Sequence, residues 1–348
     1  MKAATTSRFH SEMSAASRQR SARRRSMSSS RRSIRVGCAM ERAYAPHRTA
    51  SVICREFVLL SDNTRAMRGA TLYRRAMGAI RVGPARIPSR ESPEAAVEAL
   101  VAAGYTACEI DFESGFWMDY PWAERLGEVA REAGIALSVH APLFGFMGHL
   151  EPSGKKWASA VGALDRSAGI AAACGADPVV FHPGFLLGRS REDAIASVVE
   201  QLGTLRERLE QKERAVPFAI EVMGRVRDLG SLDDVVEISR QTGWVRPVID
   251  FAHMHATSDG AMLAVNAFAD ALAAADAVIE PGRAFHVHFS DIAFANRNET
   301  KHLPYGEGTL RAEPLREALA RFDRPATVIS ESPDEASSQA IRSILLLD

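Results

Sequence analysis

The sequence predicts a (β/α)8 barrel from three observations. Short runs of β-branched and aromatic residues alternate with helical patterns eight times between residue 79 and the C-terminus. Histidine or a carboxylate stands at the end of six of these runs. No glycine-rich phosphate turn follows the first run, where the sequence reads GPAR at 83–86, and this argues against the alternative, an open doubly wound sheet.

The eight expected strands are short and read as buried. They cover residues 79–83, 107–112, 136–140, 178–182, 217–221, 245–250, 284–289 and 326–331. The helical patterns between and after them cover residues 93–103, 121–133, 155–174, 191–212, 232–242, 260–278, 310–322 and 334–346. Ser92 and Ser231 suit helix N-caps, and glycine follows four helices, at Gly104, Gly134, Gly175 and Gly243. Strict alternation favours parallel strands, and eight units suffice to close a barrel.

Composition limits the class of protein. The 348 residues, 46% of them hydrophobic, suit one barrel of about 250 residues with an extension. The four cysteines lie far apart without a CxxC pair, so we expect reduced thiols and neither a disulfide framework nor a thiolate zinc site. No run of about 18 apolar residues is present, which excludes a membrane-spanning helix. We therefore expect a soluble, cytoplasmic protein that acts as a monomer.

A net charge of zero hides two opposite segments. Residues 1–76 hold 17 Lys and Arg against 4 Asp and Glu, whereas residues 77–348 hold 26 against 39. We expect a disordered Arg/Ser-rich extension at 1–76 and the catalytic barrel at 77–348. The extension suits a transit-type peptide, a DNA-tethering arm, a solvated tail, or upstream sequence foreign to the native protein. We favour the last, with initiation at Met67 or Met77, because the first strand follows Met77 directly.

The residues that end the strands are metal-ligand types. They are His140, His182, Glu221, Asp250, His288 and Glu331, and His253 and His302 follow in loops. A lone histidine is more often a hydrogen-bonded core residue, but six strand ends in one barrel converge on one face. His140, His182 and Glu221 could hold one ion. Glu221, Asp250, His288 and Glu331 could hold a second, and His253 with His302 a third. Imidazole and carboxylate ligands suit two to three zinc ions, with manganese or iron as alternatives.

The remaining histidines give weaker signals. His286 faces the same side of its strand as His288 but lies one layer deeper, where it could only donate a hydrogen bond behind the ligands. We expect His149 and His255 to lie in loops and face solvent, although His149 could reach over the site.

At these residues the chain resembles the endonuclease IV family, zinc-dependent DNA-repair enzymes that cut beside abasic sites and belong to the wider xylose-isomerase-like barrel group. The resemblance covers residues 82–331, and its most specific segments are FHPG at 181–184, IDFAH at 249–253, HFSD at 288–291 and KHLPYGEG at 301–308. It implies three zinc ions on the eight ligand-type residues given above, with Glu221 bridging two of them and taking part in catalysis. It also implies DNA with abasic sites as the partner.

The chain departs from this family at two places. The family has an aspartate two residues before the histidine that matches His302, and this chain has Thr300 there, with Glu299 one step earlier. Either Glu299 takes over as a ligand after a small loop shift, or the third ion is weakly bound or absent. Leu143 also replaces a tyrosine that the family inserts into DNA, and the loop at 113–118 lacks the family's arginine.

Two enzymatic functions remain open, and a non-catalytic metal-binding scaffold is a third, less favoured class. The resemblance favours a phosphodiesterase of base excision repair, in which a metal-held hydroxide attacks phosphorus. The alternative is a sugar isomerase or epimerase of the same barrel group, in which carboxylates such as Glu221 and Glu331 move protons. An isomerase needs one ion and leaves His140, His182, His253 and His302 without a role. The number of ions therefore separates the two functions, and the eight ligand-type residues favour hydrolysis.

Overall fold

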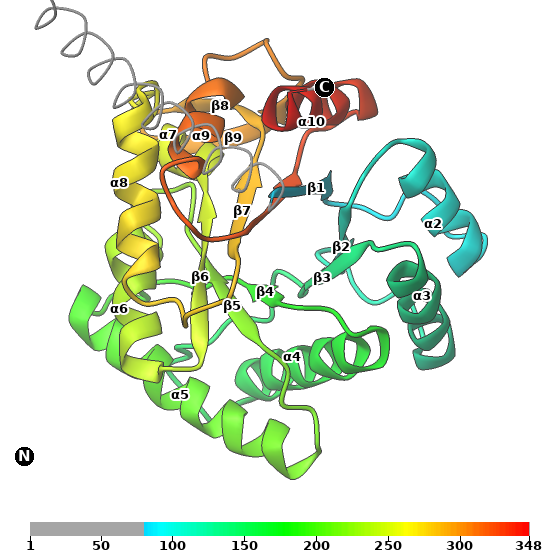
Figure 1. Cartoon of the computed structure of the whole chain (residues 1–348). Coiled ribbons are helices and arrows are strands. Elements are labelled where there is room, and N and C mark those ends of the chain that lie inside the picture. Colours follow the sequence, from blue (N-terminus) through cyan, green and yellow to red (C-terminus); the bar gives the residue numbers. More distant parts are fainter. Residues whose placement is uncertain (1–79, 348) are drawn as a thin grey trace, which may run out of the picture. The chain divides into compact units, whose positions relative to one another are not determined.

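The computed structural model describes residues 80–347, so the extension predicted at 1–76 lies outside the described residues. Eight parallel strands form one sheet in the order β1-β10-β7-β6-β5-β4-β3-β2, which curls into a nearly closed barrel (Figure 1). The strands are β1 (Ile80–Pro84), β2 (Ala107–Asp111), β3 (Ala136–His140), β4 (Val179–Phe181), β5 (Phe218–Glu221), β6 (Val245–Asp250), β7 (Phe285–Phe289) and β10 (Ala326–Ser330). The predicted (β/α)8 barrel is confirmed, and each strand end lies within one residue of its prediction.

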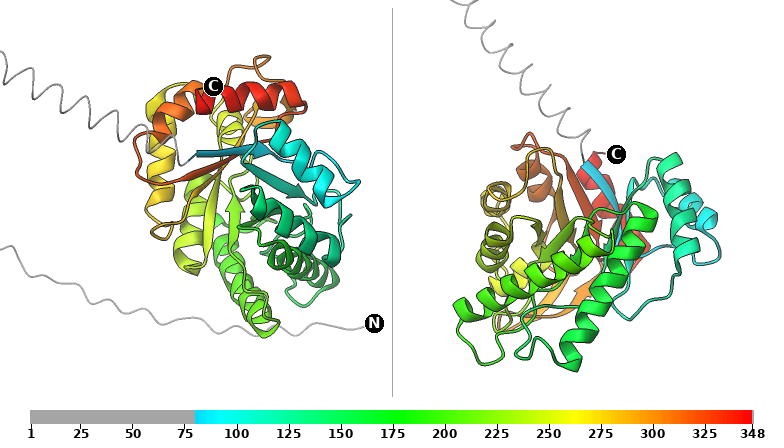
Figure 2. Two further views of the ribbon diagram at one scale, coloured as in Figure 1. Left: turned by 45° about the vertical axis from the view of Figure 1, so that its right-hand side comes forward. Right: turned by 90° about the horizontal axis from the view of Figure 1, so that it is seen from below.

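Helices lie outside the strands, as the further views in Figure 2 show. They are α2 (Pro93–Ala102), α3 (Tyr120–Glu132), α4 (Lys155–Cys174), α5 (Arg191–Gln211), α6 (Leu232–Thr242), α7 (Phe251–Thr257), α8 (Val265–Asp276), α9 (Ala312–Leu319) and α10 (Glu335–Leu346). The predicted caps form: Ser92 accepts from the Ala95 amide, and Ser231 forms a capping box with Asp234. Gly175 and Gly243 end α4 and α6 in the left-handed conformation.

The barrel closes between β1 and β2. The Thr106 amide donates to the Val82 carbonyl at 3.0 Å, and the Val82 amide donates to the Thr106 hydroxyl at 3.2 Å. Gly83 lies at this seam, where a Cβ atom would stand 1.7 Å from the Ala107 carbonyl oxygen. Only glycine lets the two backbones approach this closely.

Two elements were not expected from the sequence. Helix α7 begins directly after β6, where Asp250 accepts a hydrogen bond from the His253 amide, and the helix predicted at 260–278 starts only at Val265. An antiparallel hairpin, β8 (Asp291–Ala295) with β9 (Asn298–Leu303), follows β7. Its turn places Asn296 and Arg297 at φ values of 53° and 61°. The sequence carries no clear hairpin signal because such turns usually contain glycine, and here arginine occupies the left-handed position.

The interior of the barrel is divided between apolar and polar side chains. Val180, Ala219 and Val248 form a small apolar cluster on the neighbouring strands β4, β5 and β6. Elsewhere in the interior, Glu109 of β2 and His286 of β7 are buried and in contact. Strands β2 and β7 are separated by β1 and β10 in the sheet, so this contact crosses the interior. A charged residue below the C-terminal rim is thus enclosed by protein.

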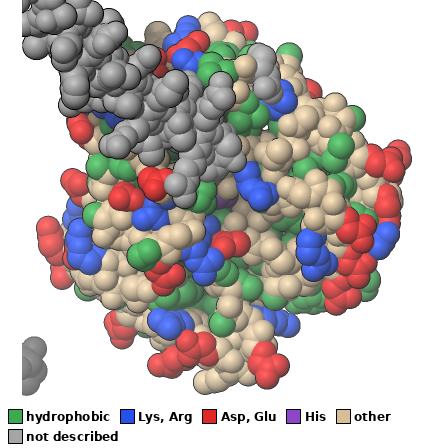
Figure 3. Space-filling model, in the orientation of Figure 1, with side chains coloured by type: hydrophobic (Ala, Val, Ile, Leu, Met, Phe, Trp, Pro, Cys, Tyr) green, Lys and Arg blue, Asp and Glu red, His purple; other side chains and the backbone are tan. Residues whose placement is uncertain are grey.

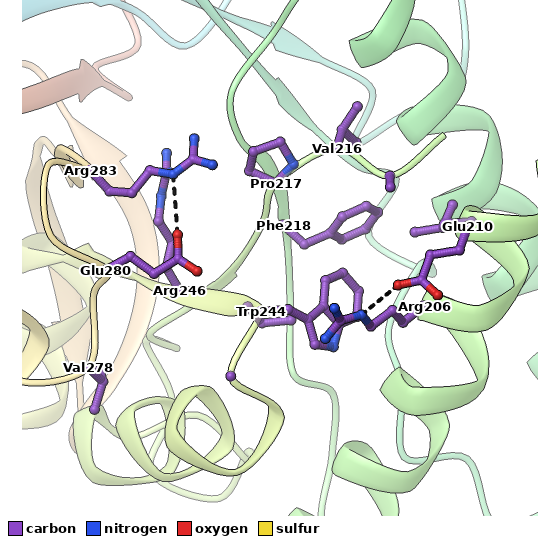
Figure 4. Close-up of a pocket in the computed structure, with 14 residues that line it drawn as sticks. Arg206, Glu210, Val216, Pro217, Phe218, Trp244, Arg246, Val278, Glu280 and Arg283 are labelled. Atoms are coloured by element: carbon purple, nitrogen blue, oxygen red, sulfur yellow. Dashed lines mark hydrogen bonds and ion pairs between the residues drawn. The ribbon is translucent and has the colours of Figure 1, made fainter. Parts of the chain in front are cut away.

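The N-terminal end of the barrel carries a separate pocket of about 270 Å³ near Trp244 and Phe218 (Figure 4). Its three arginines, Arg206, Arg246 and Arg283, each lie 2.5 to 2.8 Å from a carboxylate. Their charge is therefore balanced within the protein. This end of a barrel usually serves stability, and the strand-end residues direct attention to the other end.

The outer surface of the barrel is acidic in places. Figure 3 shows carboxylates gathered at the right-hand edge, over α2 and α3. Exposed glutamates on these helices include Glu98, Glu124, Glu128 and Glu132. Among residues 80–347, none of the helices combines the length and apolar character that a membrane crossing requires.

The closing seam generates a stability prediction. Gly83→Ala should lower the free energy of unfolding by at least about 1–3 kcal/mol, because the new methyl group meets backbone that cannot move without opening the barrel. Gly162→Ala is the matched control, since Gly162 is an exposed residue of α4 with open space around it, and alanine there should stabilise the helix by up to about 1 kcal/mol. Urea unfolding of both variants checks the prediction; equal stabilities would contradict it.

Candidate metal centre

Glu221 is the carboxylate on which three imidazoles converge. It ends β5 and is 1% exposed. Its Oε2 atom lies 3.1 Å from His140 Nε2 and 3.2 Å from His182 Nε2, and its Oε1 atom lies 3.1 Å from His288 Nδ1. These residues come from β3, the end of β4, and β7. The predicted convergence of strand ends therefore occurs, with Glu221 at its centre.

Potential ligands fall into four groups, in each of which the donor atoms lie within 4.8 Å of one another. One group, Glu109, His286 and His288, lies below the rim. The other three adjoin one another at the rim. These three are His140, His182 and Glu221; Glu221, Asp250, His288 and Glu331; and His253, His302 and Glu331. Glu221 and Glu331 each belong to two groups, as a carboxylate that bridges two ions must. The structure thus brings together eight of the nine residues predicted as ligands.

The electrostatics of these groups suit a cation. Burial raises the pKa of Asp250 well above its usual range, and its Oδ2 atom is enclosed without a hydrogen-bond partner among residues 80–347. Burial alone would also raise the pKa of Glu221, but the neighbouring His288 and His140 outweigh it and hold that pKa well below its usual range. Burial opposes the charge on His140, yet Glu221 raises its pKa to about 10. A site that draws protons onto its imidazoles in this way needs positive charge, which a divalent ion supplies.

The third group has a defined orientation. His253 Nδ1 lies 2.8 Å from the Val222 carbonyl oxygen and donates to it, so Nε2 is the nitrogen that would act as a ligand. His302 lies on β9, where its Nδ1 atom is 2.6 Å from the Ser290 hydroxyl. Its Nε2 atom lies 3.9 Å from Glu331 Oε2. Ser290 was not predicted as a site residue, and here it holds the His302 ring.

A β-bulge explains how Glu299 comes to this group. In β9, Glu299 pairs with Phe294 and Lys301 pairs with Ala293, so Thr300 between them is the extra residue. Strand residues three apart normally face opposite sides, but the bulge puts Glu299 two pairing positions before His302 and on the same side. Glu299 Oε2 lies 2.7 Å from His253 Nε2. The Thr300 hydroxyl instead donates to the Ala293 carbonyl.

Glu299 also fits tightly against the neighbouring loop. A Cβ atom at Gly224 would stand 2.4 Å from Glu299 Oε2, so the glycine makes room for this carboxylate. Arg225 of the same loop lies 3.4 Å from its other oxygen. Burial alone would raise the pKa of Glu299, but His253 lowers it below the usual range. Glu299 therefore lies beside the third group as a charged residue.

A pocket of about 230 Å³ opens beside these groups, bounded among others by Arg86, Glu113, His302 and Glu331. Glu113 follows β2, and burial raises its pKa against the opposing effect of His140. A carboxyl group whose pKa is raised in this way is better suited to exchange a proton with a bound molecule. The sequence analysis gave Glu113 no role, because nothing in the chain marks a loop carboxylate as enclosed.

Glu109 is the main residue that sequence reasoning missed. It is 1% exposed, and its Oε2 atom accepts from the Ser138 hydroxyl at 2.7 Å and from His286 Nε2 at 3.0 Å. His286 thus donates a hydrogen bond behind the ligands, as its position suggested. The available signal was a glutamate inside the apolar run that forms β2. The strand pattern alone did not show that Glu109 faces the interior.

Two histidines differ from their predictions. His255 was expected in a loop facing solvent, but it is fully buried in α7, with Nε2 2.8 Å from the Thr309 hydroxyl. His149 is 8% exposed and stacks on the Phe146 ring, with its Nε2 3.1 Å from the Phe146 carbonyl oxygen. His149 lies in a loop as predicted, but its predicted exposure was wrong because a loop residue can be enclosed when another element packs over it. For His255 both the loop and the exposure were wrong, because a helix not expected from the sequence contains it.

Comparison with known proteins agrees with this architecture. Residues 97–347 match the family model described as xylose isomerase-like TIM barrel. An uncharacterized protein of Methanocaldococcus jannaschii is 29% identical over 254 residues, which are 72% of this chain and 91% of that protein.

Solved structures with the same fold include enzymes of two kinds. A 3-keto-D-glucoside 4-epimerase from E. coli is similar with a TM-score of 0.58 and 18% identity, covering 78% of this chain and 99% of that one. Endonuclease IV from Thermus thermophilus is similar with a TM-score of 0.56 and 18% identity, covering 76% of this chain and 97% of that one. The architecture is shared, and the family model covers well over half of the sequence. The chain therefore belongs to the xylose isomerase-like TIM barrel family.

Proposed function

We propose that the protein is a metal-dependent phosphodiesterase that cleaves DNA at abasic sites, with residues 77–348 as its catalytic domain. The observation that carries this proposal is the set of three adjoining donor groups joined through Glu221 and Glu331. A single-ion enzyme needs only one such group. Three groups provide places for two to three ions, which we propose to be zinc, and phosphodiester hydrolysis commonly uses ions this close together.

Each residue has a distinct task in this proposal. Bound ions supply Lewis acidity and lower the pKa of a water molecule. Glu221 would hold two of the ions, because each of its oxygens faces a different set of imidazoles. His253 and His302 would hold a third ion, and Glu299 lies beside them. The rigid strand ends keep these groups in register with one another.

A basic edge beside the centre supports a nucleic-acid partner. Exposed Arg225 and Arg227 lie on the loop after β5, which bridges to Asn298 of the hairpin, next to exposed Arg297. On the other side, Phe185 of the loop after β4 bridges to the β5 loop, and its side chain is 43% exposed. Arginines contact phosphates, and exposed aromatic rings stack on bases. This edge offsets locally the acidic surface of the rest of the barrel.

A second function, sugar isomerisation or epimerisation, is favoured by a different observation. Glu221, Asp250, His288 and Glu331 alone complete a site for one ion. Glu113, with its raised pKa, lines the adjoining pocket and could move a proton. Epimerases are also among the solved structures that share the fold. In this alternative the other histidines have no catalytic task.

Metal content and activity together separate the two functions. We expect the metal-replete protein to hold two to three divalent ions by elemental analysis, and to cleave an oligonucleotide duplex at an abasic site. Chelator treatment should abolish cleavage, and added metal should restore it. One ion per chain with turnover of a ketose and none of DNA would reject the proposal. A chain that starts at Met77 tests the domain assignment. It should hold the same number of ions as the full chain and cleave the same DNA.

Glu221→Gln tests the shared carboxylate. The amide keeps the shape of the side chain but removes the charge that two ions share, so cleavage should fall at least about a hundredfold and metal should be partly lost. Glu128→Gln, an exposed residue of α3, is the matched control and should change nothing. Unchanged turnover in Glu221→Gln would exclude Glu221 as the bridge.

The bulge in β9 predicts opposite results for two adjacent residues. Glu299→Ala should weaken one ion selectively, because it removes the carboxylate next to His253. Thr300→Ala should have little effect, because the Thr300 hydroxyl faces the Ala293 carbonyl. Metal titration of both variants measures this. Loss of metal in Thr300→Ala alone would show that the ligand is wrongly assigned. If neither substitution has an effect, the third ion is dispensable and the enzyme works with two ions.

The basic edge predicts a salt-dependent effect. Arg227→Ala should raise KM for abasic DNA and reduce the slope of log affinity against log salt by about 1, because one phosphate contact is lost. Arg131→Ala is the control, since Arg131 is equally exposed but lies at the C-terminal end of α3, near the N-terminal end of the barrel. If the slope of log affinity against log salt is identical in the two variants, Arg227 does not contact the DNA.

A further inference from the structure

Glu109 is a buried charge below the metal centre with two separately engaged oxygens. Oε2 accepts from the Ser138 hydroxyl and from His286 Nε2, at 2.7 and 3.0 Å. Oε1 lies 3.1 Å from Nε2 of His288. This last pair is at hydrogen-bond distance but out of line, and neither atom has another hydrogen-bond partner among residues 80–347. The two atoms therefore have only each other to satisfy them.

The two nitrogens of His288 face different parts of the protein. Nδ1 lies 3.1 Å from Glu221 Oε1 and 3.2 Å from Glu331 Oε1, inside the second donor group. Nε2 points down the barrel to Glu109. A neutral imidazole carries one proton and one lone pair. Nδ1 can therefore bind an ion only when Nε2 holds the proton, and a carboxylate beside Nε2 stabilises that arrangement.

We propose that Glu109 is the positioning residue of the metal centre: it holds the proton of His288 on Nε2 and thereby presents the Nδ1 lone pair to the ion bound with Glu221, Asp250 and Glu331. This inference rests on the proposed metal centre. Ser138 and His286 anchor one oxygen of Glu109, so that the other stays directed at His288. Glu109 lies outside the three groups at the rim. It belongs, with His286 and His288, to the group below them, which shares His288 with the second rim group.

The anchoring also explains why the charge is tolerated in the interior. A buried carboxylate without partners costs several kcal/mol, and three donors from β3 and β7 surround this one. Because the partners come from strands on different sides of the barrel, the side chain cannot turn away without breaking contacts. The orientation of His288 is thus fixed from below by the barrel, and a bound ion would fix it from above.

The test measures metal affinity in the full chain by competition with a chromophoric chelator, using zinc as the probe. Glu109→Gln keeps the volume of the side chain but removes its charge, and it should weaken one ion by about 10- to 100-fold while the others keep their affinity. Glu109→Asp keeps the charge at shorter reach and should lie between wild type and Glu109→Gln. Ser138→Ala, which removes a donor to the other oxygen only, should change affinity less than about threefold.

A second readout follows the proton itself. In the zinc-loaded, ¹⁵N-histidine-labelled protein, the Nε2 proton of His288 should give a downfield, slowly exchanging NMR signal, and Glu109→Gln should shift it upfield and speed its exchange. If Glu109→Gln does not fold, Glu109→Asp carries both measurements.

Three results would overturn the inference. Unchanged affinity in Glu109→Gln would remove the positioning role. One ion lost even at saturating zinc would make Glu109 a ligand itself. Equal weakening of every ion would indicate a general structural role. None of these measurements uses DNA or a sugar. A wild-type protein that binds a single ion would therefore reject the proposed function, while the effect of Glu109 on that ion would still be measured.

Discussion

The structure is organised around a carboxylate that cannot be buried alone. Glu221 ends a central strand with almost no exposed surface, and imidazoles from three other strands approach it within 3.2 Å. Its charge is tolerated there only because positive charge or hydrogen-bond donors surround it. This requirement explains why the neighbouring strand ends carry imidazole side chains. It also makes the rim a candidate site for divalent ions.

The interior below the rim has an apolar part and a polar part. One part of the barrel is filled by Val180, Ala219 and Val248, which pack without polar needs. The other part holds Glu109 and His286, which pair across the barrel. The apolar side chains that pack below Glu221 make its surroundings less polar, and this strengthens the electrostatic interactions of its carboxylate. The polar part places Glu109 Oε1 3.1 Å from His288 Nε2, so in our proposal the two parts of the core serve stability and ligand orientation respectively.

Much of the fold and of the candidate site could be predicted from the sequence. Parallel strands in a barrel all end on one face, so a histidine such as His140 or a carboxylate such as Glu331, placed at the end of an apolar run, can be assigned to a shared rim without coordinates. Helix ends could also be predicted from the sequence, because Ser231 and Gly243 act only on the backbone within a few residues.

Periodicity and chain direction were thus enough to predict the eight-stranded architecture and the ligand-type residues on its rim.

Other features arise only once the chain has folded. The role of Glu109 depends on contacts across the barrel, between strands far apart in the chain. The approach of Glu299 to His253 depends on a bulge at Thr300, which shifts the facing of a strand by one residue. Such contacts follow from register and closure, and neither is encoded in any local pattern.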